Sequence, residues 1–472
     1  MENGTDDKEI EGLLKKSNRK FIERDLIEFL KIPSNTLNKK GIQDAMEFII
    51  SYISPFTQKV DEIEGKINPL IFAEVEGQLK SSLLIYMMYD TQPVHDDTKW
   101  FSGPFSAEIR ILPKPLDMLG KCIVSRGAYN SKTPLLSFLN VIKILKESKK
   151  LPISLLLLFD GEEEVGSPTL LKFLKNQKDL FKKCGNAYYP AAKLDLEGKA
   201  VLKLGYKGIL SLNIKLFSEN EETHSAYSSI IPNPAVELIC LLNHIYSENK
   251  FNIPSLKRTY KLNNQEEIII DTLSNKIDIN KIKMKAGITQ TFEENAKEAF
   301  IDFLFNPTFN ISTLKSGYLG EGIKNIVPIS AECNIDIRFS HDISVGEIYK
   351  EIKSLIEKFA EKSKLQVKLT KNICYEGSRV SINSKLTTSL LKSFQTLKVK
   401  AEIWPLSAAS APLSQIQKDL GLDFIVGGLG LGGYAHSPNE FIQVDSILNM
   451  RLSNYYFLKY YSKDNSKLLK TN

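Results

Sequence analysis

Two apolar runs that each end in carboxylates constrain the fold of this chain most. The first is SSLLIYMMYD at residues 81–90, and the second is LPISLLLLFD at residues 151–160, which continues into three glutamates. Runs of this kind, alternating with helix-like stretches such as residues 133–150, are typical of a buried parallel sheet covered by helices. Polar groups at the carboxyl ends of such strands meet at one edge. The pattern therefore predicts an α/β domain with Asp90 and the carboxylates of residues 160–164 on that edge.

The pattern changes between residues 208 and 376. Residues 208–220 and 331–340 alternate apolar and polar side chains, as strands with one exposed face do, and residues 344–363 form an amphipathic helical pattern. This combination indicates an antiparallel α+β domain. After residue 377 the α/β pattern returns. We therefore predict one α/β domain built from residues 1–207 and 377–472, interrupted by an inserted α+β domain of residues 208–376.

Composition narrows the class of protein. The chain has 472 residues, 42% of them hydrophobic and 25% charged, which is enough to bury a large core. Its net charge of +6 and the lack of a dense basic patch argue against a nucleic-acid binder. No apolar run reaches 18 residues and the polar N-terminus has no signal-peptide pattern, so no membrane association is expected. Five scattered cysteines without a CxxC motif indicate a reduced, cytoplasmic chain.

Two segments carry groups suited to chemistry. Asp160, Glu162, Glu163 and Glu164 stand within five positions after an apolar strand, and their mutual repulsion is relieved either by a metal cation or by full solvation. His436 follows the glycine-rich stretch GGLGLGG, where the backbone can approach other groups closely. A single histidine of this kind can be a ligand or a structural residue.

Six short segments stand in the order found in one enzyme family. The segments are Tyr89–Val94, Trp100 with Gly103–Phe105, Ser125–Asn130, Glu162–Ser167, Thr223–Ser225 and Ala435–Glu440. The chain resembles the two-metal amidohydrolases that include acetylornithine deacetylase, succinyl-diaminopimelate desuccinylase, aminoacylase, glutamate carboxypeptidase and carnosine-type dipeptidase. The dipeptidase branch is most similar, because Gly-Tyr-Lys-Gly and Lys-Asn-Ile-Val-Pro strings are shared as well. The resemblance implies a catalytic α/β domain with an inserted dimerisation, or lid, domain, and hence a homodimer.

The resemblance also implies roles for individual residues. The family uses two divalent ions, usually zinc, bridged by a carboxylate and by a water that a glutamate deprotonates. That glutamate corresponds to Glu163, and two metal ligands correspond to Glu164 and His436. Asp90 corresponds to the aspartate that orients the first ligand histidine. His224 corresponds to the lid histidine that steadies the developing oxyanion across the dimer interface.

Three other ligand positions depart from the family. Met88 stands where the first ligand histidine is expected, Asn130 where the bridging aspartate is expected, and Ala191 where a late carboxylate is expected. A thioether is a soft, weak donor, an amide oxygen is neutral, and a methyl group cannot ligate. Asp195 or Glu197 could supply the late carboxylate if the correspondence is shifted by a few residues.

Substrate-binding positions depart in part. The glycine-rich segment that receives the substrate carboxylate in the family reads Leu-Ser-Ala-Ala-Ser-Ala-Pro at residues 406–412, with Leu406 at the position of an arginine. Arg338 corresponds to a substrate-anchoring arginine of the dipeptidase branch. The remaining histidines, His95, His244 and His341, are interpreted as surface or structural residues.

Two functions remain open from the sequence. All three departures fall on one ion, while the other keeps Glu164 and His436 with Asn130 as a weak third ligand, so the sequence leaves one divalent ion (zinc, manganese or cobalt) or none. One hypothesis is a metallopeptidase or deacylase with an impaired or mononuclear metal site, acting on a small peptide or an N-acyl amino acid. The alternative is a non-catalytic pseudoenzyme that acts as a binding or dimer-partner protein.

Overall fold

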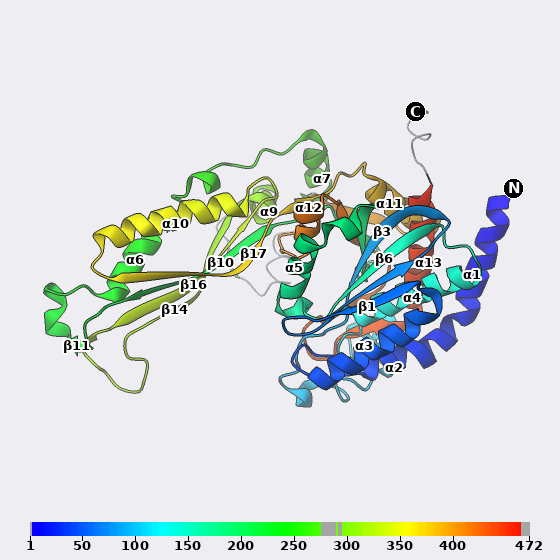
Figure 1. The fold of residues 1–472 in the computed structure, drawn as a ribbon, viewed down its shortest axis with the longest axis horizontal. Coiled ribbons are helices and arrows are strands. Elements are labelled where there is room, and N and C mark those ends of the chain that lie inside the picture. The colour runs from blue at the N-terminus through cyan, green and yellow to red at the C-terminus, as the bar shows by residue number, and fades with distance from the viewer. Residues whose placement is uncertain (1, 275–288, 291–294, 464–472) are drawn as a thin grey trace. The chain divides into compact units, whose positions relative to one another are not determined.

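The computed structural model describes residues 2–274, 289–290 and 295–463 (Figure 1). The chain divides into two compact units, of which the first comprises Met1–Leu204, Val380–Ile403 and Gln415–Asn472, and the second Gly205–Arg379 and Trp404–Ser414. The sequence pattern predicts that residues 404–414 belong to the α/β domain, whereas in the structure Trp404–Ser414 belongs to the second unit. The reason is backbone pairing, because the N–H of Ser407 donates to Gly205 and the N–H of Lys207 donates to Ser407.

The first unit is built on a six-stranded sheet. Four strands of this sheet pair in parallel with one another, namely β6, β3, β7 and β20. The apolar residues 83–88 of β3 are fully buried, as expected for a strand covered on both faces. The strands, in spatial order, are β1 (Lys59–Ile63), β2 (Leu70–Val75), β6 (Ile153–Asp160), β3 (Leu79–Met88), β7 (Cys184–Pro190) and β20 (Phe424–Gly427).

The buried parallel sheet expected from the sequence forms only part of the observed sheet. β2 runs antiparallel to β6, and β1 runs antiparallel to β2, so the sheet is mixed. The physical reason lies in the connection between β2 and β3, which consists only of residues 76–78. A parallel crossover needs about a dozen residues or more, so the chain has to reverse its direction there.

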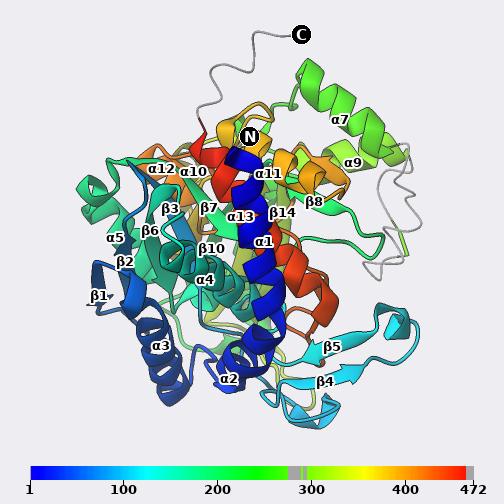
Figure 2. The ribbon, with the colours of Figure 1, turned by 90° about the vertical axis from the view of Figure 1, so that its right-hand side faces the viewer.

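Helices cover this sheet on both faces. α5 packs Phe173 against Phe72 of β2, while α4 contacts β3 and β7. Figure 2 shows α1 lying along α13, where the buried Arg451 of α13 donates to the carbonyl oxygen of Leu14. The helices of this unit are α1 (Glu2–Lys20), α2 (Ile27–Lys31), α3 (Lys39–Ile53), α4 (Lys132–Glu147), α5 (Pro168–Asn176), α11 (Lys385–Thr396), α12 (Ser414–Leu420) and α13 (Val444–Ser462).

A second, smaller sheet belongs to the same unit and escaped the sequence analysis. Its strands are too short to show a clear periodicity, and they come from two distant parts of the chain. In spatial order they are β21 (Gly432–Gly433), β22 (Phe441–Gln443), β5 (Lys121–Val124) and β4 (Glu108–Ile111). The pairing of β22 with β5 brings the loop that carries His436 next to the loop that carries Asn130.

The second unit is an antiparallel sheet with helices on one face, as its alternating strands predicted. α6 (Pro234–Ile245) and α10 (Val345–Lys362) bury Leu238, Ile348 and Ile352 against the apolar face of the strands. The helices α7 (Asn264–Ser274) and α9 (Ala296–Phe305) complete its longer elements. Its strands, in spatial order, are β14 (Thr308–Ser316), β16 (Ser330–Phe339), β10 (Gly208–Phe217) and β17 (Gln366–Tyr375).

The observed architecture is therefore α/β with a separate α+β unit, in agreement with the predicted fold class. The assignment of the second unit as a dimerisation domain stays a prediction. Within the described ranges, no helix is long and apolar enough to cross a membrane.

Candidate functional site

The site lies at the carboxyl edge of the main sheet, where β3 ends at Met88 and the parallel β6 ends at Asp160. Asp90, just beyond β3, is fully buried. Its two carboxylate oxygens accept the backbone N–H groups of Glu163 and Glu164, at 3.2 and 3.1 Å. The prediction that Asp90 and the carboxylate cluster share one edge is confirmed.

Two of the four clustered carboxylates accept hydrogen bonds from the backbone or from neighbouring hydroxyl groups. Glu162 is fully buried and accepts the backbone N–H groups of Asn68 (2.9 Å) and Thr169 (2.8 Å). Asp160 accepts the hydroxyls of Tyr86 (3.0 Å) and Ser167 (2.6 Å), and burial raises its pKa to about 6. Local hydrogen bonds, rather than a cation or bulk water, therefore satisfy these two groups.

Among the described residues, no group is hydrogen-bonded to the carboxylate of Glu163. Glu163 stands at the start of a single 3₁₀ turn, Glu163–Val165, and its side chain is half-buried. Burial, followed by the negative charges of Glu164 and Asp90, raises its pKa well above the usual range. Gly161 permits this turn, because a Cβ there would meet the Tyr89 hydroxyl at 2.5 Å.

Three side-chain atoms converge next to Glu163. Oε1 of Glu164 lies 3.3 Å from Nε2 of His436 and 3.3 Å from Nδ2 of Asn130, and the last two atoms are 3.1 Å apart. The hydrogen bond to Glu164 raises the pKa of His436. These three atoms form a nearly equilateral triangle, which we call the ligand triangle.

The dimensions of the ligand triangle match those of a metal site. Ligand atoms about 2.0–2.1 Å from zinc in tetrahedral geometry lie about 3.3 Å from one another. A half-turn of the Asn130 amide exchanges Nδ2 for Oδ1, so the third corner can present an oxygen donor. Glu164, His436 and Asn130 could therefore together hold a divalent ion. Among the described residues no group of three or more His, Cys, Asp and Glu side chains is arranged for a metal, so the amide is needed.

A buried ion pair holds one corner of the triangle. Glu440 accepts the Arg126 guanidinium at 2.7 Å, and both side chains are at most 3% exposed. The other oxygen of Glu440 accepts the backbone N–H groups of Tyr129 and Asn130, at 3.0 and 2.8 Å. Because a charged group buried without its partner is costly, this pair fixes the loop that carries Asn130. Burial raises the pKa of Glu440.

The loop of His436 is held separately. Tyr434, His436 and Asn439 all have positive φ angles, of 59°, 63° and 62°, which are uncommon for residues with a side chain. Asn439 ties the loop down, because its amide accepts the N–H of Phe101 at 2.7 Å and donates to the carbonyl of Lys99 at 3.0 Å. The glycine-rich stretch before the loop permits close packing at Gly432, where a Cβ would meet the carbonyl oxygen of Phe441 at 2.4 Å.

The other half of the edge is built differently. Met88 is 1% exposed and Ala191, just after β7, is 8% exposed. Between the strands, the hydroxyl of Ser131 donates to the carbonyl of Met88 at 3.3 Å and accepts the hydroxyl of Tyr189 at 3.1 Å. Two positions that the family resemblance assigned to a second ion therefore carry a thioether and a methyl group, which do not fit one.

The two substitute carboxylates considered from the sequence are engaged elsewhere. Asp195 accepts the backbone N–H groups of Glu197 (2.9 Å) and Lys199 (2.8 Å) and so closes a turn. Glu197 forms an ion pair with Lys199. Asp90 also differs from its implied role, because residue 88 is a methionine and Asp90 supports the turn of Glu163 and Glu164 instead.

Two predicted site residues lie in the second unit. His224 caps a 3₁₀ turn, where its Nδ1 accepts the N–H of Ala226 at 3.1 Å, and its side chain is exposed. Arg338 of β16 donates to the hydroxyl of Ser410 at 3.0 Å. Arg338 takes part in no ion pair within the described part of the chain. The roles of both residues stay predictions.

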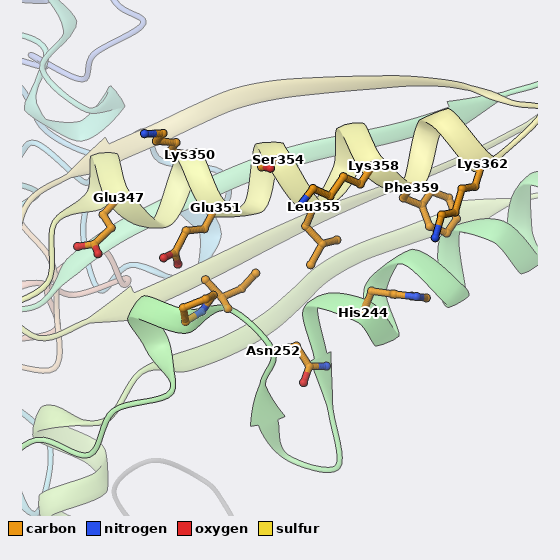
Figure 3. A pocket seen from close by; sticks show the side chains of 12 residues that line it. His244, Asn252, Glu347, Lys350, Glu351, Ser354, Leu355, Lys358, Phe359 and Lys362 are labelled. Atoms are coloured by element: carbon orange, nitrogen blue, oxygen red, sulfur yellow. The ribbon is translucent and has the colours of Figure 1, made fainter.

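A groove of about 710 Å³ runs along α10 in the second unit (Figure 3). It faces α6 and contains none of the predicted site residues. Glu351, one of its charged side chains, already accepts the hydroxyl and the N–H of Ser255. His244 lies at its border, where its Nδ1 donates to the carbonyl oxygen of Cys240 at 2.7 Å. His95 is exposed, and His341 packs half-buried against Tyr260.

Sequence reasoning missed four residues that shape the ligand triangle: Gln92, Arg126, Asn439 and Glu440. Gln92 donates to Oε2 of Glu164 at 2.7 Å. All four lie inside the short segments that carried the family resemblance. Those segments were therefore the available signal, although their contacts depend on loops that meet only in the folded chain.

Comparison with known proteins is consistent with this geometry. A model of peptidase family M20/M25/M40 matches residues 84–452. The Cys-Gly metallodipeptidase DUG1 of Candida albicans is 25% identical over 416 residues, which cover 86% of this chain and 84% of that protein.

Solved structures show the same fold. The M20 family metallo-carboxypeptidase Sso-CP2 from Sulfolobus solfataricus superposes with a TM-score of 0.81 at 26% identity, covering 93% of this chain and 98% of that one. The dipeptidase Dug1p from Saccharomyces cerevisiae superposes with a TM-score of 0.74 at 19% identity, covering 96% and 98%.

Proposed function

The chain belongs to peptidase family M20/M25/M40 as a dipeptidase-like member, and we propose that it hydrolyses the amide bond of a small peptide with the help of one divalent ion. The observation that carries this proposal is the ligand triangle beside Glu163. Zinc, manganese or cobalt would suit its carboxylate, imidazole and amide donors. The named relatives include metallodipeptidases, which supports hydrolysis over the non-catalytic alternative.

Each residue of the site has a separate role in the proposed reaction. A bound divalent ion would make a water more acidic and polarise the scissile carbonyl. Glu163 accepts the proton of the attacking water and passes it to the leaving amine, so it acts first as base and then as acid. Asp90 holds the backbone of Glu163 in place through its hydrogen bonds to the turn. Glu440 and Arg126 keep the loop of Asn130 fixed, so the corners of the triangle do not have to be ordered during the reaction.

Small peptides with a free carboxylate are the proposed substrates, and N-acyl amino acids are the second class to test. Arg338 is proposed to bind the substrate carboxylate, since guanidinium groups pair with carboxylates through two parallel hydrogen bonds. Arg338 contacts the neutral hydroxyl of Ser410, and among the described residues no carboxylate forms an ion pair with it. Arg338→Ala should raise KM for a dipeptide more than it lowers kcat.

A reduced, cytoplasmic homodimer joined through residues 208–376 completes the proposal. Exposed apolar side chains near His224 support the interface: Tyr227 is 51% exposed, Ile230 75% and Ile323 93%. The five free cysteines support a reducing compartment. Sedimentation should give about twice the chain mass of 53.3 kDa, and a monomer at micromolar concentration would reject the dimer and the role of His224.

A variant pair tests the activity itself. The protein, loaded with zinc, manganese or cobalt, is assayed against a panel of dipeptides and N-acyl amino acids. Glu163→Gln should lower turnover by about 10²–10⁴-fold, the usual contribution of a general base. Glu361→Gln, on the exposed face of α10, is the matched control and should leave turnover unchanged. A folded parent without turnover on any substrate would favour the non-catalytic binding protein.

A further inference from the structure

Gln92 is hydrogen-bonded to Glu164 of the ligand triangle, through the carboxylate oxygen that does not face His436 and Asn130. Its Nε2 donates to Oε2 of Glu164 at 2.7 Å, while Oε1 of Glu164 faces His436 and Asn130. The reverse orientation of the Gln92 amide would place two acceptor oxygens at this distance, so donation is the favourable arrangement. The two oxygens of Glu164 are therefore assigned to different partners.

The segment that carries Gln92 is itself firmly held. The N–H of Thr91 donates to the carbonyl of Ser34 at 2.9 Å, and the N–H of Thr36 donates to the carbonyl of Thr91 at 3.1 Å. One residue earlier, Asp90 binds the backbone of the turn that carries Glu164. The segment that follows β3 thus holds Glu164 through its backbone and through its side chain. A donor on such a fixed segment limits the rotation of the carboxylate.

We propose that Gln92 is a positioning residue that restricts Glu164 to coordination through a single oxygen. This inference rests on the proposed function, because it concerns the ion of the same site. A free carboxylate can bind a cation through one oxygen or through both. A hydrogen bond from the Gln92 amide to Oε2 favours binding of the cation through Oε1 alone. Substitution of residues that are hydrogen-bonded to a metal ligand commonly changes metal affinity by 10–100-fold.

The consequence is an open coordination position. With one oxygen from Glu164, one nitrogen from His436 and one oxygen from Asn130, the chain would supply three ligands to the ion. Catalytic zinc sites keep the fourth position for water or substrate. If Glu164 bound through both oxygens, the chain itself would fill that position, and the substrate carbonyl would have to compete for it.

Cobalt binding tests this inference without relying on turnover. Gln92→Met keeps a side chain of similar length but removes the N–H donor. Gln43→Met is the matched control, because Gln43 makes the same kind of bond, to Glu47 at 2.8 Å, on the exposed face of α3. Both variants and the parent are titrated with Co²⁺, and the visible absorption bands and the dissociation constant are recorded. Melting of the metal-free proteins checks that all three are folded.

The parent and Gln43→Met should give the intense visible bands of four-coordinate Co²⁺. Gln92→Met should give weaker bands, because coordination through both oxygens raises the coordination number, and a dissociation constant about tenfold larger. A folded Gln92→Met with the spectrum and affinity of the parent would overturn the role of Gln92 while leaving the proposed function intact. A folded parent that binds no Co²⁺ would overturn both.

Discussion

The two halves of the carboxyl edge differ in what satisfies their polar groups. On one half, Glu164, His436 and Asn130 point at one another with separations of 3.1–3.3 Å. On the other half, Met88 and Ala191 are buried, and the nearby hydroxyls of Ser131 and Tyr189 bond to each other and to the backbone. The first half keeps polar atoms converging on one point, whereas the second is packed closed. Of the three positions that differ from the expected ligand set, Met88 and Ala191 thus lie on the second half, and Asn130 lies in the ligand triangle.

The largest effect should come from removing a corner of the ligand triangle. His436→Ala should weaken zinc binding at least about 100-fold, more than the usual effect of a partner outside the coordination shell. Met88→Leu, on the other half, should leave the affinity within about twofold, because a thioether contributes little. Titration calorimetry on both variants makes the comparison. Equal losses in the two variants would mean that Met88 belongs to the metal site.

A second test introduces metal-ligating side chains on the closed half of the edge and a carboxylate at residue 130. The triple variant Met88→His, Asn130→Asp and Ala191→Asp should bind two zinc ions per chain where the parent binds one. Its turnover of dipeptides should rise at least about tenfold, since a second ion and a charged bridge hold the water more firmly. Thermal melting verifies that the buried substitutions are tolerated. A folded triple variant that still binds one ion would show that another residue, not residue 191, fills the late position.

Asn130→Asp alone should have an intermediate effect. A charged oxygen in place of a neutral one should tighten zinc binding about tenfold, or about 1.4 kcal/mol. Without metal, the new carboxylate would stand about 3.3 Å from Glu164, and two like charges so close repel. The melting temperature should therefore fall in chelator and rise with zinc. A variant that melts identically under both conditions would place Asn130 outside the triangle.

The sequence predicted most of the fold, because long apolar runs and amphipathic stretches report burial directly. The apolar run of residues 151–160 contains β6, and the alternating residues 331–340 contain most of β16. The features of the fold that the sequence did not predict depend on chain connections and on short strands. The three-residue link before β3 forces the antiparallel side of the sheet, and the two-residue β21 shows no periodicity.

The candidate site was predictable only in its residue types. Glu163, Glu164 and His436 stood out because carboxylates followed a buried strand and a histidine followed a glycine-rich loop. The contacts of Gln92 and Glu440 could not be read from spacing, since Glu440 lies more than three hundred positions from the N–H groups that it binds. The contacts of Glu440 arise from the pairing of β22 with β5, and the contact of Gln92 arises from the pairing of β3 with β6. No local pattern encodes either pairing.

The smallest effect concerns Asp160, which lies opposite Met88 in the strand register and is satisfied by hydroxyls. Its pKa is raised to about 6, above the value of about 4 in an unfolded chain, so the folded state holds its proton longer as pH rises. The free energy of unfolding should therefore fall by about 1 kcal/mol between pH 5 and pH 7 because of this group. Asp160→Asn should lack this part of the slope in denaturant titrations. A variant with the slope of the parent would mean that Asp160 is ionised throughout that range.

Metal content is the most direct test of the central claim that only one half of the edge binds an ion. The purified protein is saturated with zinc, dialysed, and analysed for metal and protein together, beside His436→Ala. The account predicts one zinc per 53.3 kDa chain in the parent and none retained in the variant. Two zinc ions per chain in the parent would contradict it, because the half with Met88 and Ala191 would then hold a metal as well.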